Sequence, residues 1–154
     1  MVDIAQDIRI AARALIIQDN KVLAQHKVYD NGEERFTLPG GAPYPGEPLE
    51  KGLIRECQEE IGAKITVFEL MHVADLFKRK KSVANTIQQQ IEVIFRCDVP
   101  VGYKPRNGKK PDQHQVDVIW LDIEQHRNKL FPHDLVEIIN EPDRRRPVYM
   151  GLIK

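Results

Sequence analysis

Alternating and helical patterns of apolar residues divide the chain into strands and helices. The segment TIQQQIEVIFRC alternates most clearly, because Ile91, Val93 and Phe95 fall on one face of a strand while Gln90 and Glu92 fall on the other. Turn-forming residues such as Asp19-Asn20 separate the apolar segments. The strands predicted in this way are residues 9–17, 21–28, 36–38, 86–97 and 115–121, with one more inside 64–77.

One segment predicts an amphipathic helix that follows a loop rich in glycine and proline. Pro48 suits the first turn of a helix, and Gly62 suits the left-handed position just after the last turn, so the helix should cover residues 48–61. Its apolar residues share one arc, which should face the core. A second helix is predicted over residues 132–140, where apolar residues again recur at helical spacing.

Three carboxylates share one face of the first helix. Glu56, Glu59 and Glu60 fall within an arc of roughly 100°. They repel one another, and they lie in the later half of the helix, where the helix dipole gives anions no stabilisation. A bound divalent cation would relieve this repulsion, and oxygen ligands favour magnesium or manganese. Gly52 precedes these carboxylates by one turn and should leave room for a ligand to approach them.

The glycine-rich loop and the acidic helix together resemble the Nudix signature over residues 41–63. The fixed positions of that signature correspond here to Gly41, Glu47, Arg55-Glu56, Glu59-Glu60 and Gly62. The resemblance implies an α/β (α+β) fold, a Nudix-type α/β/α sandwich with a mixed β-sheet between helices. We expect residues 1–154 to form a single domain of this kind.

The resemblance also implies a MutT-like pyrophosphohydrolase that cleaves a nucleoside diphosphate linked to another group and uses Mg²⁺ or Mn²⁺. Glu56, Glu59 and Glu60 match the metal-binding carboxylates of the family, and the carbonyl of Gly40 would be a further ligand. Glu56 is the preferred general base, although this role differs among members. Arg55 would orient a carboxylate through a bidentate pair, and the preceding Glu47 would hold the loop to the helix.

Further candidates for the site lie outside the signature. Family members can take an additional carboxylate or base from a later strand or loop, and Glu92, Asp112, Asp117 and His114 are the candidates here. The basic run at residues 78–81 is predicted to lie in a loop. Lys78 in this run is either part of a solvated turn or a contact for a phosphate or an RNA backbone.

Substrate choice is set outside the signature. A nucleoside triphosphate or a related nucleotide is the first expectation, and a nucleotide sugar or ADP-ribose is the alternative. ADP-ribose-cleaving relatives commonly carry a proline about sixteen residues after the last glycine of the motif, whereas this chain has Phe77-Lys78-Arg79 there. Two alternatives are not enzymes, namely a non-catalytic nucleotide-binding sensor and a purely structural module. A sensor would not need all three glutamates.

Composition narrows the choice of partners and compartment. The chain has 23 basic and 23 acidic residues, so no overall charge favours nucleic acid or a membrane surface. No apolar run approaches the length of a membrane span, and Cys57 and Cys97 are expected to be reduced core residues of a cytoplasmic protein. We interpret the tail from residue 144 as a surface or homodimer segment.

Overall fold

The structure is a computed structural model that describes residues 1–80 and 82–154. Its strands are β1 (Asp3–Ile4), β2 (Arg9–Leu15), β3 (Ile17–Gln18), β4 (Lys21–Val28), β5 (Glu34–Thr37), β6 (Gly40–Gly41), β7 (Thr66–Arg79), β8 (Thr86–Asp98), β9 (Gln115–Leu121) and β10 (Tyr149–Ile153). Its helices are α1 (Leu49–Ile61), α2 (Ile123–His126), the short 3₁₀ turn η1 (Arg127–Lys129) and α3 (Leu135–Asn140).

Within the described residues the strands form two sheets. The mixed sheet has the order β10-β7-β8-β2-β6, and β1 also pairs with β8. In this sheet β2 runs parallel to β8, whereas β7 and β8 form a long antiparallel hairpin. The second sheet is antiparallel, with β4 between β5 and β9 and with β3 also paired to β4. The polypeptide passes between the sheets from β2 to β3 and again from β5 to β6.

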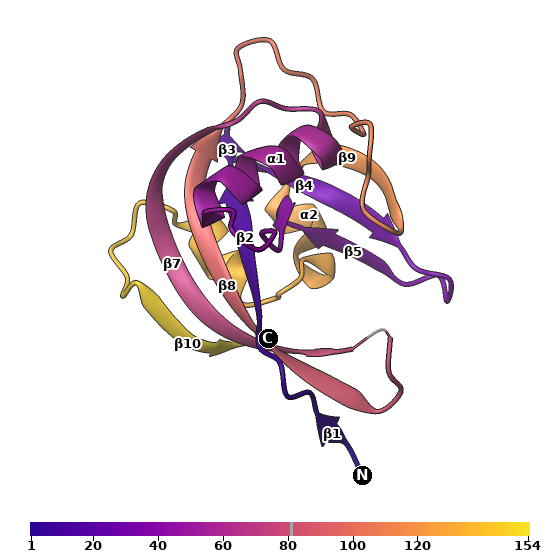
Figure 1. The fold of residues 1–154 in the computed structure, drawn as a ribbon. Coiled ribbons are helices and arrows are strands. Elements are labelled where there is room, and N and C mark those ends of the chain that lie inside the picture. Colours follow the sequence, from indigo (N-terminus) through magenta and orange to yellow (C-terminus); the bar gives the residue numbers. More distant parts are fainter. Residues whose placement is uncertain (81) are drawn as a thin grey trace.

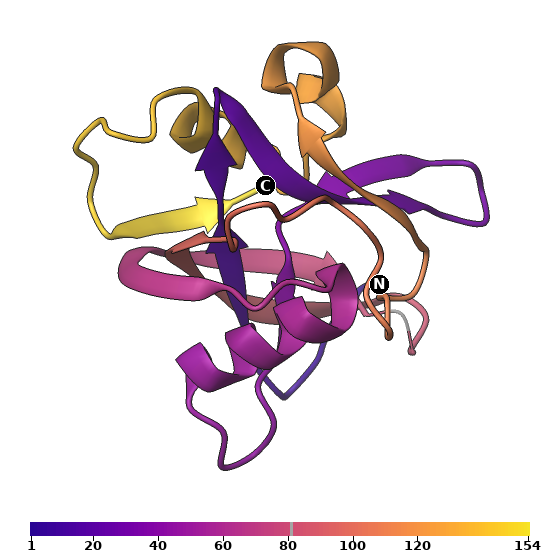
Figure 2. The same ribbon diagram turned by 90° about the horizontal axis from the view of Figure 1, so that it is seen from above.

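The sheets lie between α1 on one side and α2 and α3 on the other, as Figures 1 and 2 show. Leu53, Cys57 and Ile61 of α1 pack against Ala12 and Ala14 of β2 in one apolar cluster. A second cluster joins the opposite face of the mixed sheet to the second sheet and α3. The prediction of an α/β/α sandwich with a mixed sheet is therefore confirmed, and the finding not predicted is that its strands divide between two sheets.

Helix α1 ends where the sequence indicates. Gly62 adopts a left-handed conformation with φ of 64°, which allows Ala63 N–H to bond back to the carbonyl of Cys57 at 3.4 Å. The helix begins one residue later than predicted, because Pro48 is the residue that precedes its first turn. Both cysteines are buried and unpaired, which agrees with the expectation of reduced core thiols.

Three local predictions need correction. Lys78 and Arg79 continue strand β7 rather than forming a loop, because the β7–β8 ladder extends to the pair Arg79 and Ile87. The run continues with Lys80, which is outside the strand, and its last residue, 81, lies outside the described residues. The second predicted helix is shorter, with only 135–140 helical, and α2 was not predicted.

The segment from residue 144, predicted to be a surface or homodimer segment, is largely exposed and includes a strand. Residues 149–153 form β10, which pairs in parallel with β7 and lies at the edge of the mixed sheet (Figure 1). Arg146 holds the preceding segment through its guanidinium, which donates to the backbone carbonyls of Glu137 at 2.9 Å and Glu141 at 2.6 Å. No described helix is both long and apolar enough to cross a bilayer.

Candidate active site

Strand β6 places the backbone of the glycine loop against the acidic face of α1. Gly40 and Gly41 pair with Arg13 and Ala12 of β2. Gly40 has a φ of 138°, and a Cβ there would overlap the carbonyl oxygen of Ala12, so only glycine fits this close approach. A Cβ on Gly41 would lie 3.0 Å from the carboxyl carbon of Glu56. The loop backbone is therefore in direct contact with the first of the three predicted metal ligands.

Arg55 joins the loop to the carboxylates. Its Nε and Nη2 donate to the two carboxylate oxygens of Glu47 at 2.9 and 3.0 Å, which is a bidentate pair. Its Nη1 lies 3.3 Å from one oxygen of Glu56 and 3.3 Å from one oxygen of Glu59. These bonds raise the pKa of Arg55 and lower the pKa of Glu47, and the Arg55–Glu47 hydrogen bond is the main cause of both shifts. The expected bidentate pair exists, and its partner is Glu47.

Gly52 serves the loop rather than a ligand. A Cβ at this position would lie 2.9 Å from an oxygen of Glu47 and 3.2 Å from Cα of Pro43. The expectation that Gly52 leaves room for something to approach the carboxylates is therefore wrong. The missing side chain lets the loop pack closely on α1, so that Glu47 can reach Arg55.

Glu60 is the most buried of the three carboxylates. Gln25 of β4 donates to its Oε2 at 2.8 Å, and the other oxygen, Oε1, is buried without a hydrogen-bond partner in the described part of the chain. Burial, with a contribution from the nearby carboxylate of Glu56, raises the pKa of Glu60 to about 8. Gln25 itself is held by Gln115 and Thr37, at 2.9 and 3.3 Å, so the orientation of Glu60 is fixed by a network within the core.

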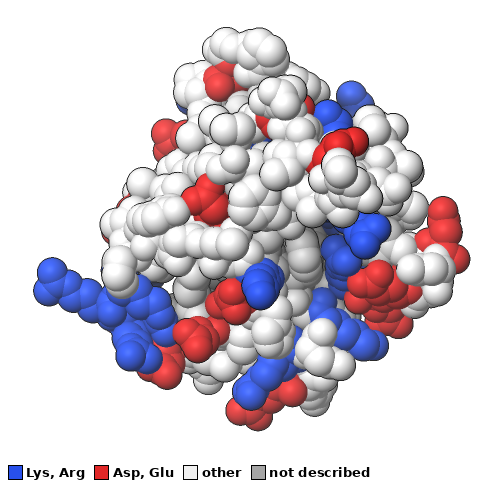
Figure 3. All heavy atoms as spheres, turned by 90° about the horizontal axis from the view of Figure 1, so that it is seen from below, with Lys and Arg blue, Asp and Glu red and all other residues white. Residues whose placement is uncertain are grey.

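A cleft of about 700 Å³ adjoins this acidic face. Both Glu56 and Glu60 line it, as do Gly40 and Gly41. The side chain of Glu59 instead lies beside Arg55 and is not among the lining residues. The surface seen from below is hollowed between basic and acidic side chains, as Figure 3 shows.

The candidates from outside the signature divide into two groups. Glu92, Asp112 and Lys78 all line the cleft. His114 does not line it, and its ring lies 5.0 Å from that of Tyr29, the residue that follows β4. The side chain of Asp117 is exposed outside the cleft and accepts from the next backbone N–H at 2.8 Å. The geometry thus brings together three of the five candidates.

Sequence reasoning missed several polar residues that the fold brings to the site. Arg13 donates to Glu92 at 3.0 Å and to the carbonyl of Gly40 at 3.1 Å, so it connects the sheet to the loop. Lys27 donates to Asp112 at 2.6 Å across the cleft wall. Arg13 interrupts an otherwise apolar predicted strand, and that interruption was the available signal, whereas Lys27 follows Gln25 and His26 and gives no such signal.

The donor set fits a hard divalent cation. Glu56 and Glu60 supply carboxylate oxygens, Gly40 supplies a backbone carbonyl, and Oε1 of Glu60 is a buried acceptor that lacks a donor. A cation there would also stabilise the ionised carboxylate of Glu60 and so oppose the effect of burial on its pKa. Among the described residues, no three His, Cys, Asp or Glu side chains already form a complete metal cluster, because Glu59 faces Arg55 and Glu60 faces Gln25.

The fold and the site together define a class of hydrolase, in which an α/β/α sandwich presents a glycine loop and an acidic helix to a cleft. The NUDIX domain family matches residues 7–141. Because this match covers most of the chain, the protein belongs to the Nudix family. The prediction of a Nudix pyrophosphohydrolase is thereby confirmed at the level of the family.

Individual relatives agree with this assignment. A MutT-like protein from Streptomyces ambofaciens is 26% identical over 137 residues, which cover 88% of this chain and 77% of that protein. A NUDIX hydrolase from Nitrosomonas europaea superposes with a TM-score of 0.69 at 20% identity and covers 92% of this chain and 94% of its own. A MutT protein from Methanosarcina mazei Go1 gives a TM-score of 0.65 at 18% identity, with 90% and 96% coverage. At these identities the two structures support the fold alone.

Proposed function

We propose that residues 1–154 act as one Nudix domain that hydrolyses the diphosphate linkage of a nucleotide, with a nucleoside triphosphate as the preferred class of substrate. The reaction requires Mg²⁺ or Mn²⁺, and the products leave into the cytoplasm. The observation that carries the proposal is the pair Glu56 and Glu60, which line a cleft beside the glycine loop while one buried oxygen of Glu60 has no donor.

In this proposal Glu56, Glu60 and the carbonyl of Gly40 hold the cation, and Glu59 contributes to a second ion. A bound cation would neutralise charge on the phosphoryl oxygens and would lower the pKa of water. Arg55 fixes the rotamers of Glu56 and Glu59 through its Nη1 group, at 3.3 Å from each. Glu56 accepts the proton of the attacking water, because its carboxylate faces the cleft and is not used by the Gln25 network.

The cleft also provides basic groups for the phosphates. Arg13 and Lys27 line it, and both are oriented by carboxylates, so their positions are fixed before a substrate arrives. One wall of the cleft would then present carboxylates with a bound cation, and the opposite wall presents arginine and lysine. A phosphate chain is the ligand that matches both walls. The cleft volume of about 700 Å³ lies within the usual range for small-ligand pockets.

The alternative substrate is a nucleotide sugar or ADP-ribose. Solved structures of similar fold include a UDP-X diphosphatase and an ADP-ribose pyrophosphatase from Streptococcus suis, which are 21% and 18% identical to this chain. At such identities the substrates of those proteins do not carry over. The missing proline near Phe77 argues against the ADP-ribose subclass, and the basic cleft argues for additional phosphate.

The decisive experiment is phosphate or pyrophosphate release from a nucleotide panel with magnesium. The panel holds nucleoside triphosphates and diphosphates, ADP-ribose, other nucleotide sugars and dinucleoside polyphosphates. We expect turnover with magnesium that is lost with a chelator, and a fall of at least about 100-fold in Glu60→Gln. Glu50→Gln is the matched control, since Glu50 lies in the first turn of the same helix and does not line the cleft.

Two outcomes would contradict the proposal. Full activity of Glu60→Gln would remove this helix face from the chemistry. Binding of nucleotides without any turnover, in a wild-type protein whose melting temperature rises with magnesium, would instead support the nucleotide sensor.

A further inference from the structure

The mixed sheet carries basic side chains on the cleft floor that the carboxylate site does not use. In the ladder, Arg9 lies opposite Gln90 and Lys78 lies opposite Gln88. Residues that are paired across strands, or that are two apart on one strand, share a face of the sheet. All four therefore lie on one face, and all four line the cleft. Further along the strands this same face becomes the apolar core.

Most other cations of the cleft are already paired with a carboxylate. These pairs are Arg13–Glu92 at 3.0 Å, Lys27–Asp112 at 2.6 Å, Arg35–Glu33 at 3.0 Å and Lys80–Asp7 at 3.3 Å. In contrast, neither Lys78 nor Arg9 has a carboxylate within ion-pair distance in the part of the chain that the structure describes. The floor of the cleft thus holds two basic side chains that lack an anionic partner.

Lys78 is the less exposed of these two side chains. Burial, together with the charges of the neighbouring Arg13 and Arg9, lowers its pKa to about 8, and the nearby Glu92 only partly opposes this shift. A cation that is removed from water beside like charges is costly unless an anion accompanies it. The face of the sheet that continues into the apolar core thus carries two basic residues and two glutamines at the cleft, of which Gln90 is buried and Arg9 is exposed. Such an arrangement is expected where a ligand supplies the missing charge.

We propose that Arg9 and Lys78 form a subsite for a phosphate group of the substrate that lies outside the hydrolysed diphosphate. This inference rests on the proposed function. Arg9 and Arg13 are four residues apart on β2, about 13 Å along the strand, and Arg13 contacts Gly40 beside the carboxylates. The subsite therefore lies further along the cleft floor than the proposed metal site.

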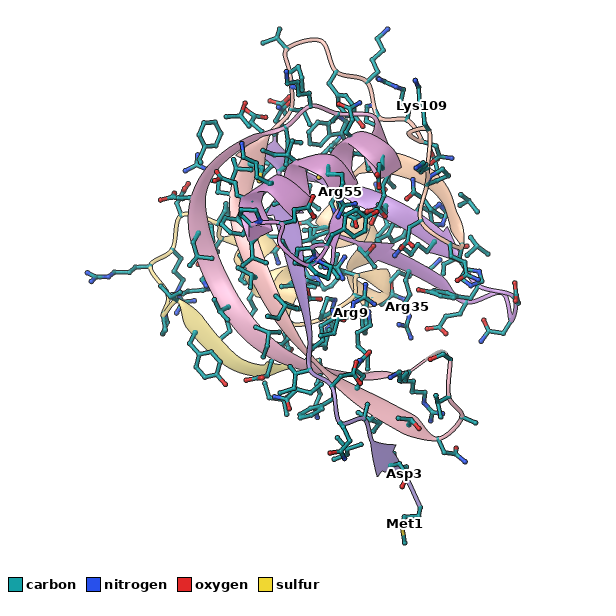
Figure 4. All side chains as sticks on the ribbon, in the orientation of Figure 1. Met1, Asp3, Arg9, Arg35, Arg55 and Lys109 are labelled. Atoms are coloured by element: carbon teal, nitrogen blue, oxygen red, sulfur yellow. The ribbon has the colours of Figure 1, made fainter. Side chains whose placement is uncertain are left out.

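This geometry selects a substrate with a second anionic group. The group is either the third phosphate of a nucleoside triphosphate or a phosphate on the sugar of a nucleotide sugar, since both present the same oxygens to a guanidinium and an ammonium. A nucleotide whose far end is neutral would leave the subsite empty. Figure 4 shows Arg9 and Arg35 on the same side of the molecule below Arg55, and both arginines line the cleft.

The test compares Lys78→Met and Arg9→Gln with wild type on two matched pairs of substrates. One pair is a nucleoside triphosphate and its diphosphate, and the other is a nucleotide sugar with and without a phosphate on its sugar. We expect KM for the member with the additional phosphate to rise about 10- to 100-fold, as for a lost charged hydrogen bond, with kcat little changed. Lys78→Arg should restore most of the affinity.

Lys64→Met is the matched control, because it removes an exposed lysine outside the cleft. A loss confined to the triphosphate assigns the subsite to a linear phosphate chain, and a loss confined to the sugar phosphate assigns it to the far end of the substrate. Equal changes in KM for both members of each pair, or no change in either variant, would overturn the inference.

A binding experiment separates this inference from the proposed function. Methylene-bridged analogues of a nucleoside triphosphate and diphosphate bind without being hydrolysed, and calorimetry measures their affinities in magnesium. The wild type should prefer the triphosphate analogue about tenfold, and Lys78→Met should lose that preference. If no substrate is hydrolysed, the proposed function fails, but the analogue affinities still decide the subsite.

Discussion

The two walls of the cleft differ in how the chain builds them. The acidic wall comes from one helix, where Glu56 and Glu60 are one turn apart and Arg55 holds Glu56. The basic residues of the floor come from β2 and β7, and Arg9 and Lys78 are brought together only because both strands pair with β8. The proposed metal ligands therefore reside in a short motif, whereas the proposed phosphate subsite is assembled across the sheet.

The largest effect is expected from changing Gln25, a residue of the second sheet that supports the acidic wall through its bond to Glu60. Gln25→Leu removes the donor to Oε2 of Glu60 and leaves that buried oxygen unsatisfied, a cost of about 1–3 kcal/mol in folding free energy. We expect the magnesium concentration for half-maximal activity to rise about 10- to 100-fold, as for other residues that orient a metal ligand. Titration of activity and of melting temperature with magnesium measures it.

Gln113→Leu serves as the control for Gln25→Leu. Gln113 is exposed, and its backbone N–H rather than its side chain makes the local bond, at 2.8 Å to Asp112. An unchanged magnesium midpoint in Gln25→Leu would show that Glu60 needs no support from the second sheet.

A smaller effect is expected for Arg55, which supports the same wall from within the helix. Arg55→Lys keeps the charge but cannot make the bidentate pair with Glu47 while also reaching Glu56 and Glu59. We expect kcat to fall about tenfold and stability to change by less than about 1 kcal/mol, because the pairs are partly exposed. Steady-state kinetics and thermal melting check both values, with the exposed Arg96→Lys as control.

Wild-type kcat in Arg55→Lys would mean that the arginine only anchors the loop. A loss of kcat that is accompanied by a large loss of stability would point the same way. Only a fall in kcat with the fold retained supports the orienting role that the sequence predicts.

The acidic wall was predictable because its signal is local. Helical periodicity places the three glutamates on one face. The end of the helix at Gly62 is predictable because glycine readily adopts the left-handed conformation found there. The role of Gly52 was misjudged because its neighbour, Glu47, lies on a loop whose course no helical pattern gives. The sequence therefore predicts which residues share a helix face, but not what packs against that face.

The basic floor was not predictable, for a related reason. Lys78 was assigned to a loop because four consecutive basic residues are usually a solvated turn, whereas the pairing with β8 keeps it in a strand. Pairing register depends on contacts between distant segments, and a shift of one residue would turn Lys78 to the opposite face. The division of the strands into two sheets escaped prediction in the same way, since local alternation does not specify partners.

The smallest expected effect is on the stability of the ligand-free protein, in which Lys78 costs folding free energy. Its folded pKa of about 8 lies below the ordinary 10.5, so the unfolded chain binds the additional proton between these values. Above pH 10.5 the amine is neutral in both states, so its burial costs no folding free energy. As the pH falls from 10.5 through 8, the unfolded chain gains the proton first and the folded protein loses this stability. We expect Lys78→Met to raise the melting temperature at pH 7 by about 2–4 °C, equivalent to roughly 1 kcal/mol, and to flatten its rise between pH 8 and 10.5.

The control Lys64→Met should leave the melting temperature within about 1 °C, because it removes an exposed side chain. Inorganic triphosphate should raise the melting temperature of the wild type more than that of Lys78→Met, since only the former gains an anion partner for the amine. A fall in melting temperature on Lys78→Met would mean that the lysine stabilises the sheet. A gain in stability together with a loss of triphosphate affinity is the signature of a residue kept for its ligand, because a purely structural lysine would lower both or neither.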